Sequence, residues 1–174
     1  MAKNYKKQFA GLYDKHIAQI YRYAFLKVGT KEVAEDIVAE VFTKSWKKFR
    51  TGLEIKNASA YLYQVARAEV ANYYRTGAKA EFVSIDVVPI IDSKAGPEAE
   101  QILKGDLENL QQHLKEIKEE YQDILIWYYV DGYSTKEIAA ILEKSEGAVR
   151  VMVSRALAEL REKMVKKWPE TLFA

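Results

Sequence analysis

Residues 134–160 read STKEIAAILEKSEGAVRVMVSRALAEL and are the most informative stretch of the sequence. Ser134, followed three residues later by Glu137, is a capping box that predicts the start of a short helix. Ser145 is a second predicted N-cap, and it opens a longer helix. Apolar residues recur at helical spacing on both sides of the three-residue turn 143–145. This pattern predicts a helix-turn-helix, whose second helix can enter the major groove of DNA.

The start of the second predicted helix carries the side chains that would face DNA. Arg150 can donate a fork of hydrogen bonds to guanine, worth about 1–3 kcal/mol of discrimination. Ser145 and the helix N-terminus can hold a phosphate. An ordinary helical hairpin with a solvated arginine is the alternative interpretation. In the turn, Glu143 stands where glycine is common, and Lys144 stands where an apolar packing residue is usual. The predicted DNA-facing residues are Ser145, Glu146, Arg150, Val151, Ser154 and Arg155.

The rest of the chain also has the pattern of helices, and we expect an all-α protein of two small helical domains. The 174 residues are 49% apolar and include only 3 prolines and 8 glycines, a composition that suits long helices. Three predicted helices fill residues 1–76. Residues 77–97 lose the helical period and are predicted to be an extended linker. Residues 98–174, which begin after Pro97, form the second predicted domain.

Composition excludes several classes of protein. No apolar run approaches 18 residues, so we expect no membrane span, and the N-terminus has no apolar stretch typical of a secretory signal. The absence of cysteine excludes disulfides and thiolate metal sites, and only 2 histidines are present. We therefore expect no metal, no cofactor and no catalytic residue, and a cytoplasmic location.

The net charge of +2 conceals an uneven distribution along the chain. Residues 1–76 contain 14 basic and 7 acidic side chains, whereas residues 105–174 contain 10 basic and 13 acidic side chains. The asymmetry predicts an anionic partner for the first domain and a different partner for the chain that follows. Solvated helix faces are the alternative explanation for any single run of charge.

The third predicted helix, which ends near Arg75, combines cationic and aromatic side chains. Gln64, Arg67 and Arg75 fall on one face together with Ala71. Tyrosines at positions 61, 63, 73 and 74 crowd the same helix. This mixture suits a nucleic-acid strand with unstacked bases. The alternative is that half of these tyrosines belong to the core.

Three motifs together resemble the extracytoplasmic-function (ECF) sigma factors of bacterial RNA polymerase. Residues 34–46, AEDIVAEVFTKSW, are similar to the family's A-E-D-L-V-Q-E-x-F-x-x-x-W, and residues 61–67, YLYQVAR, with 72–75, NYYR, are similar to its promoter-reading helix. The helix-turn-helix supplies the third motif, and the three occur in the family's order. Glu120 departs from the pattern, because arginine is usual there.

The resemblance implies two domains, regions 2 and 4 of the sigma-70 family, and a role for each. The β′ clamp helices of core polymerase would dock on the edge made by Asp36, Ala39, Glu40 and Thr43. Helix 59–75 and the loop 52–58 before it would read and melt the −10 element and capture a flipped base. The helix-turn-helix would read the −35 element and adjoin the β flap. An anti-sigma factor is a further implied partner. The implied −10 residues are Tyr61, Gln64, Arg67, Ala68, Ala71, Asn72 and Arg75.

The resemblance leads us to predict a non-catalytic subunit that binds core polymerase and opens promoter DNA. The alternative is a dimeric helix-turn-helix regulator that binds duplex DNA without polymerase. An enzyme is disfavoured, because the sequence has no phosphate loop and no nucleophile paired with a base.

Overall fold

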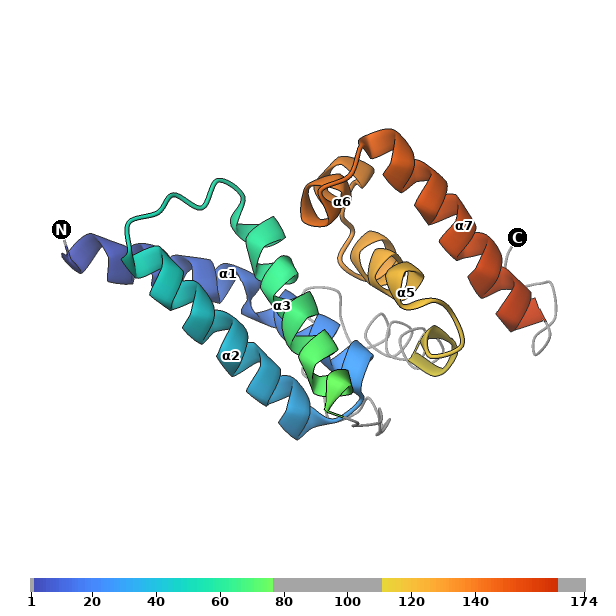
Figure 1. Cartoon of the computed structure of the whole chain (residues 1–174), viewed down its shortest axis with the longest axis horizontal. Helices are drawn as coiled ribbons and strands as arrows, with labels where there is room; N and C mark the ends of the chain where they lie inside the picture. Colours follow the sequence, from blue (N-terminus) through green and yellow to red (C-terminus); the bar gives the residue numbers. More distant parts are fainter. Residues whose placement is uncertain (1, 77–110, 166–174) are drawn as a thin grey trace, which may run out of the picture. The chain divides into compact units, whose positions relative to one another are not determined.

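The computed structural model describes residues 2–76 and 111–165 (Figure 1). These residues form helices joined by turns and contain no strand, which confirms the all-α prediction. The chain divides into two compact units between Ile90 and Ile91. The predicted linker 77–97 lies outside the described residues, as does the predicted start of the second domain.

The first unit is a bundle of α1 (Ala2–Val28), α2 (Lys31–Arg50) and α3 (Ala58–Arg75). Each helix packs against the other two, and α2 and α3 lie in front of α1 in Figure 1. The chain leaves α1 at Gly29, whose φ of +80° is in the left-handed region that favours glycine. Thr30 is the N-cap of α2, but its side chain makes no capping hydrogen bond.

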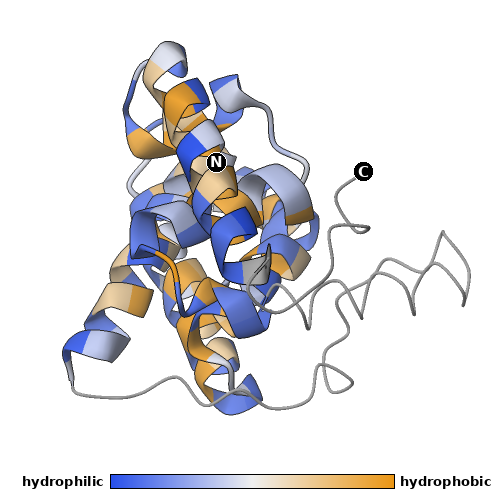
Figure 2. Ribbon diagram, turned by 90° about the vertical axis from the view of Figure 1, so that its right-hand side faces the viewer, coloured by the Kyte–Doolittle hydropathy of each residue, from blue (hydrophilic) through white to orange (hydrophobic). Residues whose placement is uncertain are grey.

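Aromatic rings fill much of the core between these helices. Phe9 on α1 lies 5.1 Å from Trp46 and 5.7 Å from Phe49, measured between ring centroids. Tyr23 on α1 and Tyr63 on α3 meet edge to face at 5.6 Å, and both are fully buried. Figure 2 shows apolar and hydrophilic residues alternating along the helices, as expected when each helix buries one face.

The second unit contains α5 (Glu119–Leu125), a π-helical turn η3 (Ile126–Val130), α6 (Thr135–Leu142) and α7 (Glu146–Val165). Residues 111–114 are also helical. α7 packs against both α5 and α6. The buried apolar residues of this unit are Leu114, Ile117, Ile124, Leu125, Ile126, Trp127, Ile138, Ala139, Ile141, Val149, Val153 and Ala156.

The π-helical turn corrects one detail of the sequence interpretation. Helical spacing predicts that Tyr128 and Tyr129 face inward with Ile124, but they are 37% and 52% exposed. Trp127 is fully buried instead. The backbone N–H of Asp131 bonds to the carbonyl of Ile126, five residues back, at 3.0 Å. Because a π turn holds more residues than an α turn, it shifts the buried positions out of the α-helical register.

Candidate polymerase and DNA interfaces

The predicted polymerase-binding edge is a solvent-exposed stripe on α2. Asp36, Ala39, Glu40 and Thr43 are all exposed, and their spacing of three, four and seven residues places them on one side of the helix. The opposite side is buried against α1 and α3. Its buried residues are Ala34, Ile37, Val38, Val41, Phe42 and Ser45. Burial of that face fixes which side of α2 a partner can reach.

Ala39 also lines a groove between α1 and α2. Tyr13 and Tyr21 contribute aromatic walls to this groove, and Phe42 contributes from α2. Tyr13 is 39% exposed, so the groove opens to solvent beside the stripe. A small residue at position 39 therefore leaves apolar surface accessible where the family pattern often has glutamine.

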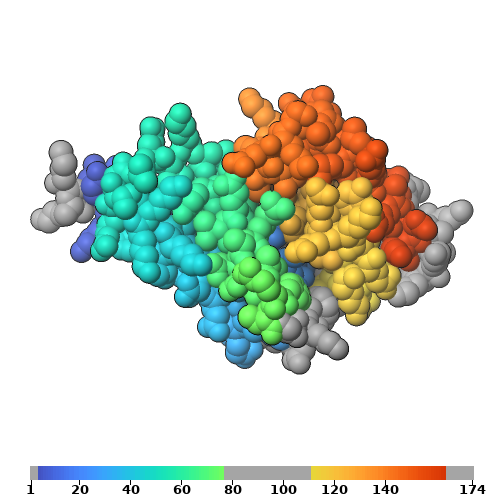
Figure 3. Space-filling model, viewed as in Figure 1, coloured from blue at the N-terminus to red at the C-terminus, as the bar shows by residue number. Residues whose placement is uncertain are grey.

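The predicted −10 residues lie on the faces of α3 that are not buried in the bundle. Asn57 caps this helix, because its Oδ1 accepts a hydrogen bond from the backbone N–H of Ala60 at 3.0 Å. The buried residues are Ala60, Leu62, Tyr63, Ala66 and Val70. Ala68, Ala71, Asn72 and Arg75 are exposed, whereas Tyr61, Gln64 and Arg67 are half-buried. On the face seen in Figure 3, α2 and α3 form the surface of this unit side by side.

The tyrosines of α3 divide between core and surface, as the alternative interpretation held. Tyr63 belongs to the core, because it is fully buried and its ring meets the ring of Tyr23 on α1. The hydroxyl of Tyr74 donates to the backbone carbonyl of Lys27 on α1. The buried Tyr63 is therefore not available to stack on a base, whereas Tyr61 lies beside the exposed Lys48.

Tyr61 lies under a lysine from the end of α2. The Nζ of Lys48 is 4.3 Å from the centroid of the Tyr61 ring, a cation–π arrangement. Burial raises the pKa of the Tyr61 hydroxyl, and a hydrogen bond with Ser45 lowers it in part. The last turn of α2 also carries Lys47 and Arg50. An aromatic ring with a cation beside it is suited to a base and its phosphate.

The loop between α2 and α3 presents an apolar side chain that sequence reasoning did not single out. Leu53 is 62% exposed. The preceding Gly52 has a φ of +77°, a backbone conformation that L-residues rarely adopt. The sequence could have indicated this residue, because Leu53 is an apolar residue between Gly52 and Glu54 in a loop predicted to contact DNA.

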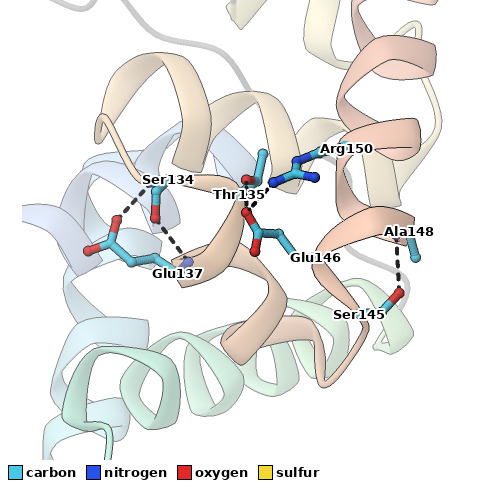
Figure 4. Close-up of polar contacts among 7 residues, drawn as sticks. All are labelled: Ser134, Thr135, Glu137, Ser145, Glu146, Ala148 and Arg150. Atoms are coloured by element: carbon cyan, nitrogen blue, oxygen red, sulfur yellow. Dashed lines mark hydrogen bonds and ion pairs between the residues drawn. The ribbon is translucent and has the colours of Figure 1, made fainter.

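The helix-turn-helix is capped as the sequence predicts. The N–H of Ser134 donates to Oε2 of Glu137 at 2.7 Å, and the N–H of Glu137 donates to Oγ of Ser134 at 3.1 Å (Figure 4). Ser145 caps α7, because its Oγ accepts from the N–H of Ala148 at 3.2 Å. The reciprocal bonds of Ser134 and Glu137 define the start of α6, and the single bond of Ser145 defines the start of α7.

Packing of α6 on α7 leaves the predicted DNA-facing set on the outside. Ser145, Arg150, Val151, Ser154 and Arg155 are exposed, and Glu146 is half-buried. On α6, Ile141 is buried and Leu142 is half-buried. The buried residues that join the two helices are Ile138, Ala139, Ile141, Val149, Val153 and Ala156.

Glu146 connects the two helices and holds Arg150. Its Oε1 accepts a hydrogen bond from Oγ1 of Thr135 on α6 at 3.0 Å. The same oxygen lies 2.8 Å from Nη2 of Arg150, one turn along α7 (Figure 4). Sequence reasoning placed Glu146 in the DNA-facing set but did not predict this chain of contacts.

Two kinds of feature are absent from the described part of the chain. No group of three or more His, Asp or Glu side chains there could hold a metal ion. No helix among residues 2–76 and 111–165 is long and apolar enough to cross a membrane.

Comparison with known proteins connects these surfaces to one family. The profile of Sigma-70 region 2 matches residues 12–80, and that of Sigma-70, region 4, matches residues 107–160. The ECF RNA polymerase sigma factor SigL of Mycobacterium tuberculosis is 30% identical over 155 residues, which cover 86% of this chain and 85% of SigL. The chain belongs to the ECF family of RNA polymerase sigma factors. The region 2 match includes α2 and α3, and the region 4 match includes the whole helix-turn-helix.

Two other relatives are also named as sigma factors, and two solved structures share the fold. The sigma factor YlaC of Bacillus subtilis is 28% identical over 91% of this chain and 93% of its own length. The ECF sigma factor BldN of Streptomyces coelicolor is 25% identical over 87% of this chain, which spans 58% of BldN. CnrH, solved with the cytosolic domain of CnrY, has a TM-score of 0.69 at 16% identity, covering 94% of this chain and 91% of CnrH. RpoE of Bartonella quintana, solved with the anti-sigma factor NepR, has a TM-score of 0.66 at 22% identity, covering 95% of this chain and 99% of RpoE.

In this ECF chain two departures from the expected pattern of region 4 are neighbours in space. Glu120 on α5 and Lys144 in the turn of the helix-turn-helix form an ion pair of 3.9 Å between Oε1 and Nζ. Both side chains are about half exposed, so the pair contributes little stability. The ion pair connects α5 to the turn before α7.

Proposed function

We propose that this chain is an alternative sigma factor that binds core RNA polymerase and directs initiation at its own set of promoters. The observation that carries the proposal is the pairing of regions 2 and 4 in one chain. In each unit the residues predicted to bind a partner lie on a face that the bundle leaves accessible. The proposed division of the chain is 1–76 for region 2, 77–97 for the linker and 98–174 for region 4.

The proposed contact with core polymerase is the stripe Asp36, Ala39, Glu40 and Thr43 on α2. Two carboxylates at i and i+4 give this edge a negative charge on a unit that is otherwise basic. Such an edge suits a basic surface on the β′ clamp helices, and charge complementarity of this kind raises the rate of association and fixes orientation. The region 4 unit would adjoin the β flap.

The proposed −10 interface is α3 together with the loop before it. Unstacking a base costs a few kcal/mol per step, so the protein must offset that cost with new contacts. Tyr61 offers a ring and Lys48 a cation for the flanking phosphate. Leu53, exposed in the loop, offers an apolar surface to a base turned out of the duplex. We assign melting to these three residues acting together.

The proposed −35 interface is α7, which places Arg150, Val151, Ser154 and Arg155 on its exposed side. The N-terminal end of the recognition helix is the part that reaches base edges in a helix-turn-helix. Ser145 would approach the phosphate backbone through the helix N-terminus. The acidic Glu143 and Glu146 nearby weaken attraction to any duplex, which fits a protein that holds DNA firmly only with polymerase.

An anti-sigma factor is the proposed regulator of this chain. Two similar structures support it, since RpoE of Bartonella quintana was solved with the anti-sigma factor NepR and CnrH with the cytosolic domain of CnrY. A protein that binds core polymerase would act in the cytoplasm, and we propose that location for this chain. The chemistry of RNA synthesis belongs to the polymerase, so the chain itself would not be an enzyme.

Binding to purified core polymerase tests the proposal. The wild-type chain is expected to co-elute with core polymerase on gel filtration. The variant Asp36→Arg with Glu40→Arg is expected to lose co-elution while keeping its helical circular dichroism. The control is Asp14→Arg with Glu162→Arg, which makes the same change of charge at exposed positions on α1 and α7 and should co-elute normally.

Two outcomes would count against the proposal. Absence of wild-type co-elution, together with tight duplex binding by the free protein, would favour the dimeric regulator. Equal co-elution of wild type and the Asp36/Glu40 variant would place the polymerase contact elsewhere.

A further inference from the structure

Glu146 occupies an unusual position for an acidic residue on a helix that reads DNA. One carboxylate oxygen, Oε1, accepts from Thr135 Oγ1 at 3.0 Å and from Arg150 Nη2 at 2.8 Å. The three side chains come from the two helices of the motif and meet on their exposed side, as Figure 4 shows. Arg150 is therefore tied through Glu146 to α6, which packs against α7 through its buried face.

Stability does not explain this arrangement. The side chains of Arg150 and Glu146 are 66% and 41% exposed. An ion pair between exposed side chains four residues apart contributes little to helix stability, and it is screened by salt. A carboxylate at the start of α7 also repels the phosphates of an approaching duplex. The contact must be explained by what it does to Arg150.

We propose that Glu146, anchored by Thr135, is a positioning residue that holds the guanidinium of Arg150 ready to bind guanine in the −35 element. Arginine has five N–H donors in a planar fork, and the bond from Nη2 to Glu146 uses one of them. The remaining edge can donate to O6 and N7 of guanine. The inference rests on the proposed role of α7 as the −35 helix.

Glu146 then has two opposite effects on DNA binding. Ordering a long side chain on binding costs about twofold to 12-fold in affinity, and Glu146 removes that cost before DNA arrives. This gain in affinity applies only to a duplex that has guanine at the position that Arg150 contacts. The repulsion from phosphate applies to every duplex. Glu146 therefore raises discrimination for guanine and lowers affinity for all other sequences.

The experiment uses the full chain bound to core polymerase. A library of promoter duplexes randomised through the −35 region is selected for binding and sequenced, and Arg150→Ala identifies the guanine that Arg150 contacts. Binding is then compared between a duplex with guanine at that position, one with adenine, and one with 7-deazaguanine, which lacks the N7 acceptor. The proteins are wild type, Glu146→Gln, Thr135→Val and the control Glu162→Gln, which removes an exposed carboxylate further along α7.

Wild type is expected to prefer guanine over adenine by about fivefold to 150-fold, with 7-deazaguanine between them. Glu146→Gln should reduce that preference by about twofold to 12-fold and bind the adenine duplex at least as well as wild type. Thr135→Val should lower the preference in the same direction, because it releases the anchor and leaves the charge. Glu162→Gln should leave the preference unchanged.

The possible failures are distinguishable. If Arg150→Ala keeps every base preference, the proposed role of Arg150 fails, and the inference fails with it. If Arg150→Ala abolishes the guanine preference but Glu146→Gln strengthens binding to both duplexes equally, Glu146 only repels phosphate and the inference is overturned. If Glu146→Gln loses a preference for cytosine at some position and keeps the guanine preference, Glu146 reads a base itself. That result would also overturn the inference.

Discussion

Replacing Glu143 by glycine should stabilise the second unit. Glu143 ends α6 with φ +54° and ψ +41°, the left-handed conformation that glycine adopts without a Cβ penalty. This conformation costs an L-residue about 1–2 kcal/mol. Glycine loses about 0.5–1 kcal/mol more backbone entropy on folding. The expected net gain for Glu143→Gly is therefore about 0.5–1 kcal/mol.

The backbone bonds at this turn should survive the change. The carbonyl of Ala139 accepts from the N–H groups of Glu143 and of Lys144, the latter at 3.1 Å, and neither bond uses a side chain. Glu143→Ala is the matched control, because it removes the carboxylate and keeps the Cβ. The control should gain none of the stability that relief of the left-handed conformation provides.

Urea unfolding followed by tryptophan fluorescence measures the effect. Trp127 is fully buried in the second unit, so a background with Trp46→Phe and Trp168→Phe makes it the sole tryptophan of the three in the chain. With a slope of about 1.5 kcal/mol per molar urea, the midpoint should rise by about 0.3–0.7 M. A lower midpoint for Glu143→Gly, or an equal rise for Glu143→Ala, would refute the assignment of strain to the backbone.

Two further predictions concern the first unit. Leu53→Ser should leave the binding of core polymerase and of duplex promoter unchanged but reduce opening of the −10 element, detected with permanganate. A promoter that is already unpaired at −10 should restore the open state. Reduced binding to polymerase would argue against a role of Leu53 in melting. Burial lowers the pKa of His16 below its ordinary 6.5 despite a hydrogen bond to Gln19. The unfolded chain therefore binds the proton more tightly than the folded chain. Stability that is present above about pH 6.5 should be lost as the pH falls. His16→Gln should remove this loss in urea titrations between pH 7 and pH 5, and an unchanged slope would exclude His16 as its source.

The helix-turn-helix could be predicted from sequence because its determinants are local. Ser134 and Glu137 act within one turn of each other, and Ser145 acts on the N–H of a residue three positions away. Glu143 was recognised as standing where glycine is common, and the structure shows why, since its φ is positive. Short-range bonds of this kind need no knowledge of the partner helices.

The remaining details depend on tertiary packing, which the helical period alone does not reveal. The π turn that exposes Tyr128 and buries Trp127 packs against α5 and α6, so its register depends on tertiary contacts. Tyr63 is distinguishable from Tyr61 only through its neighbour on α1. The ion pair between Glu120 and Lys144 joins two residues that appear in the sequence as unrelated departures. Contacts between distant segments were therefore the part that sequence reasoning missed.

The electrostatic balance of the chain agrees with a subunit that needs polymerase to hold DNA. A net charge of +2 over 174 residues gives little general attraction to a polyanion. The positive charge is concentrated in residues 1–76, where Lys48 at the end of α2 lies over the Tyr61 ring. Carboxylates on α2 and at the start of α7 oppose it locally. Promoter affinity would then come from the assembled complex and not from the free chain.

Mapping of transcription start sites tests the central claim most directly. Core polymerase alone, core with the wild-type chain, and core with Arg150→Ala would transcribe the same genomic DNA library. We expect discrete start sites only when the chain is added, preceded by two shared sequence blocks near −10 and −35. Arg150→Ala should relax the −35 block and leave the −10 block intact. The same scattered transcripts with and without the chain would contradict the account.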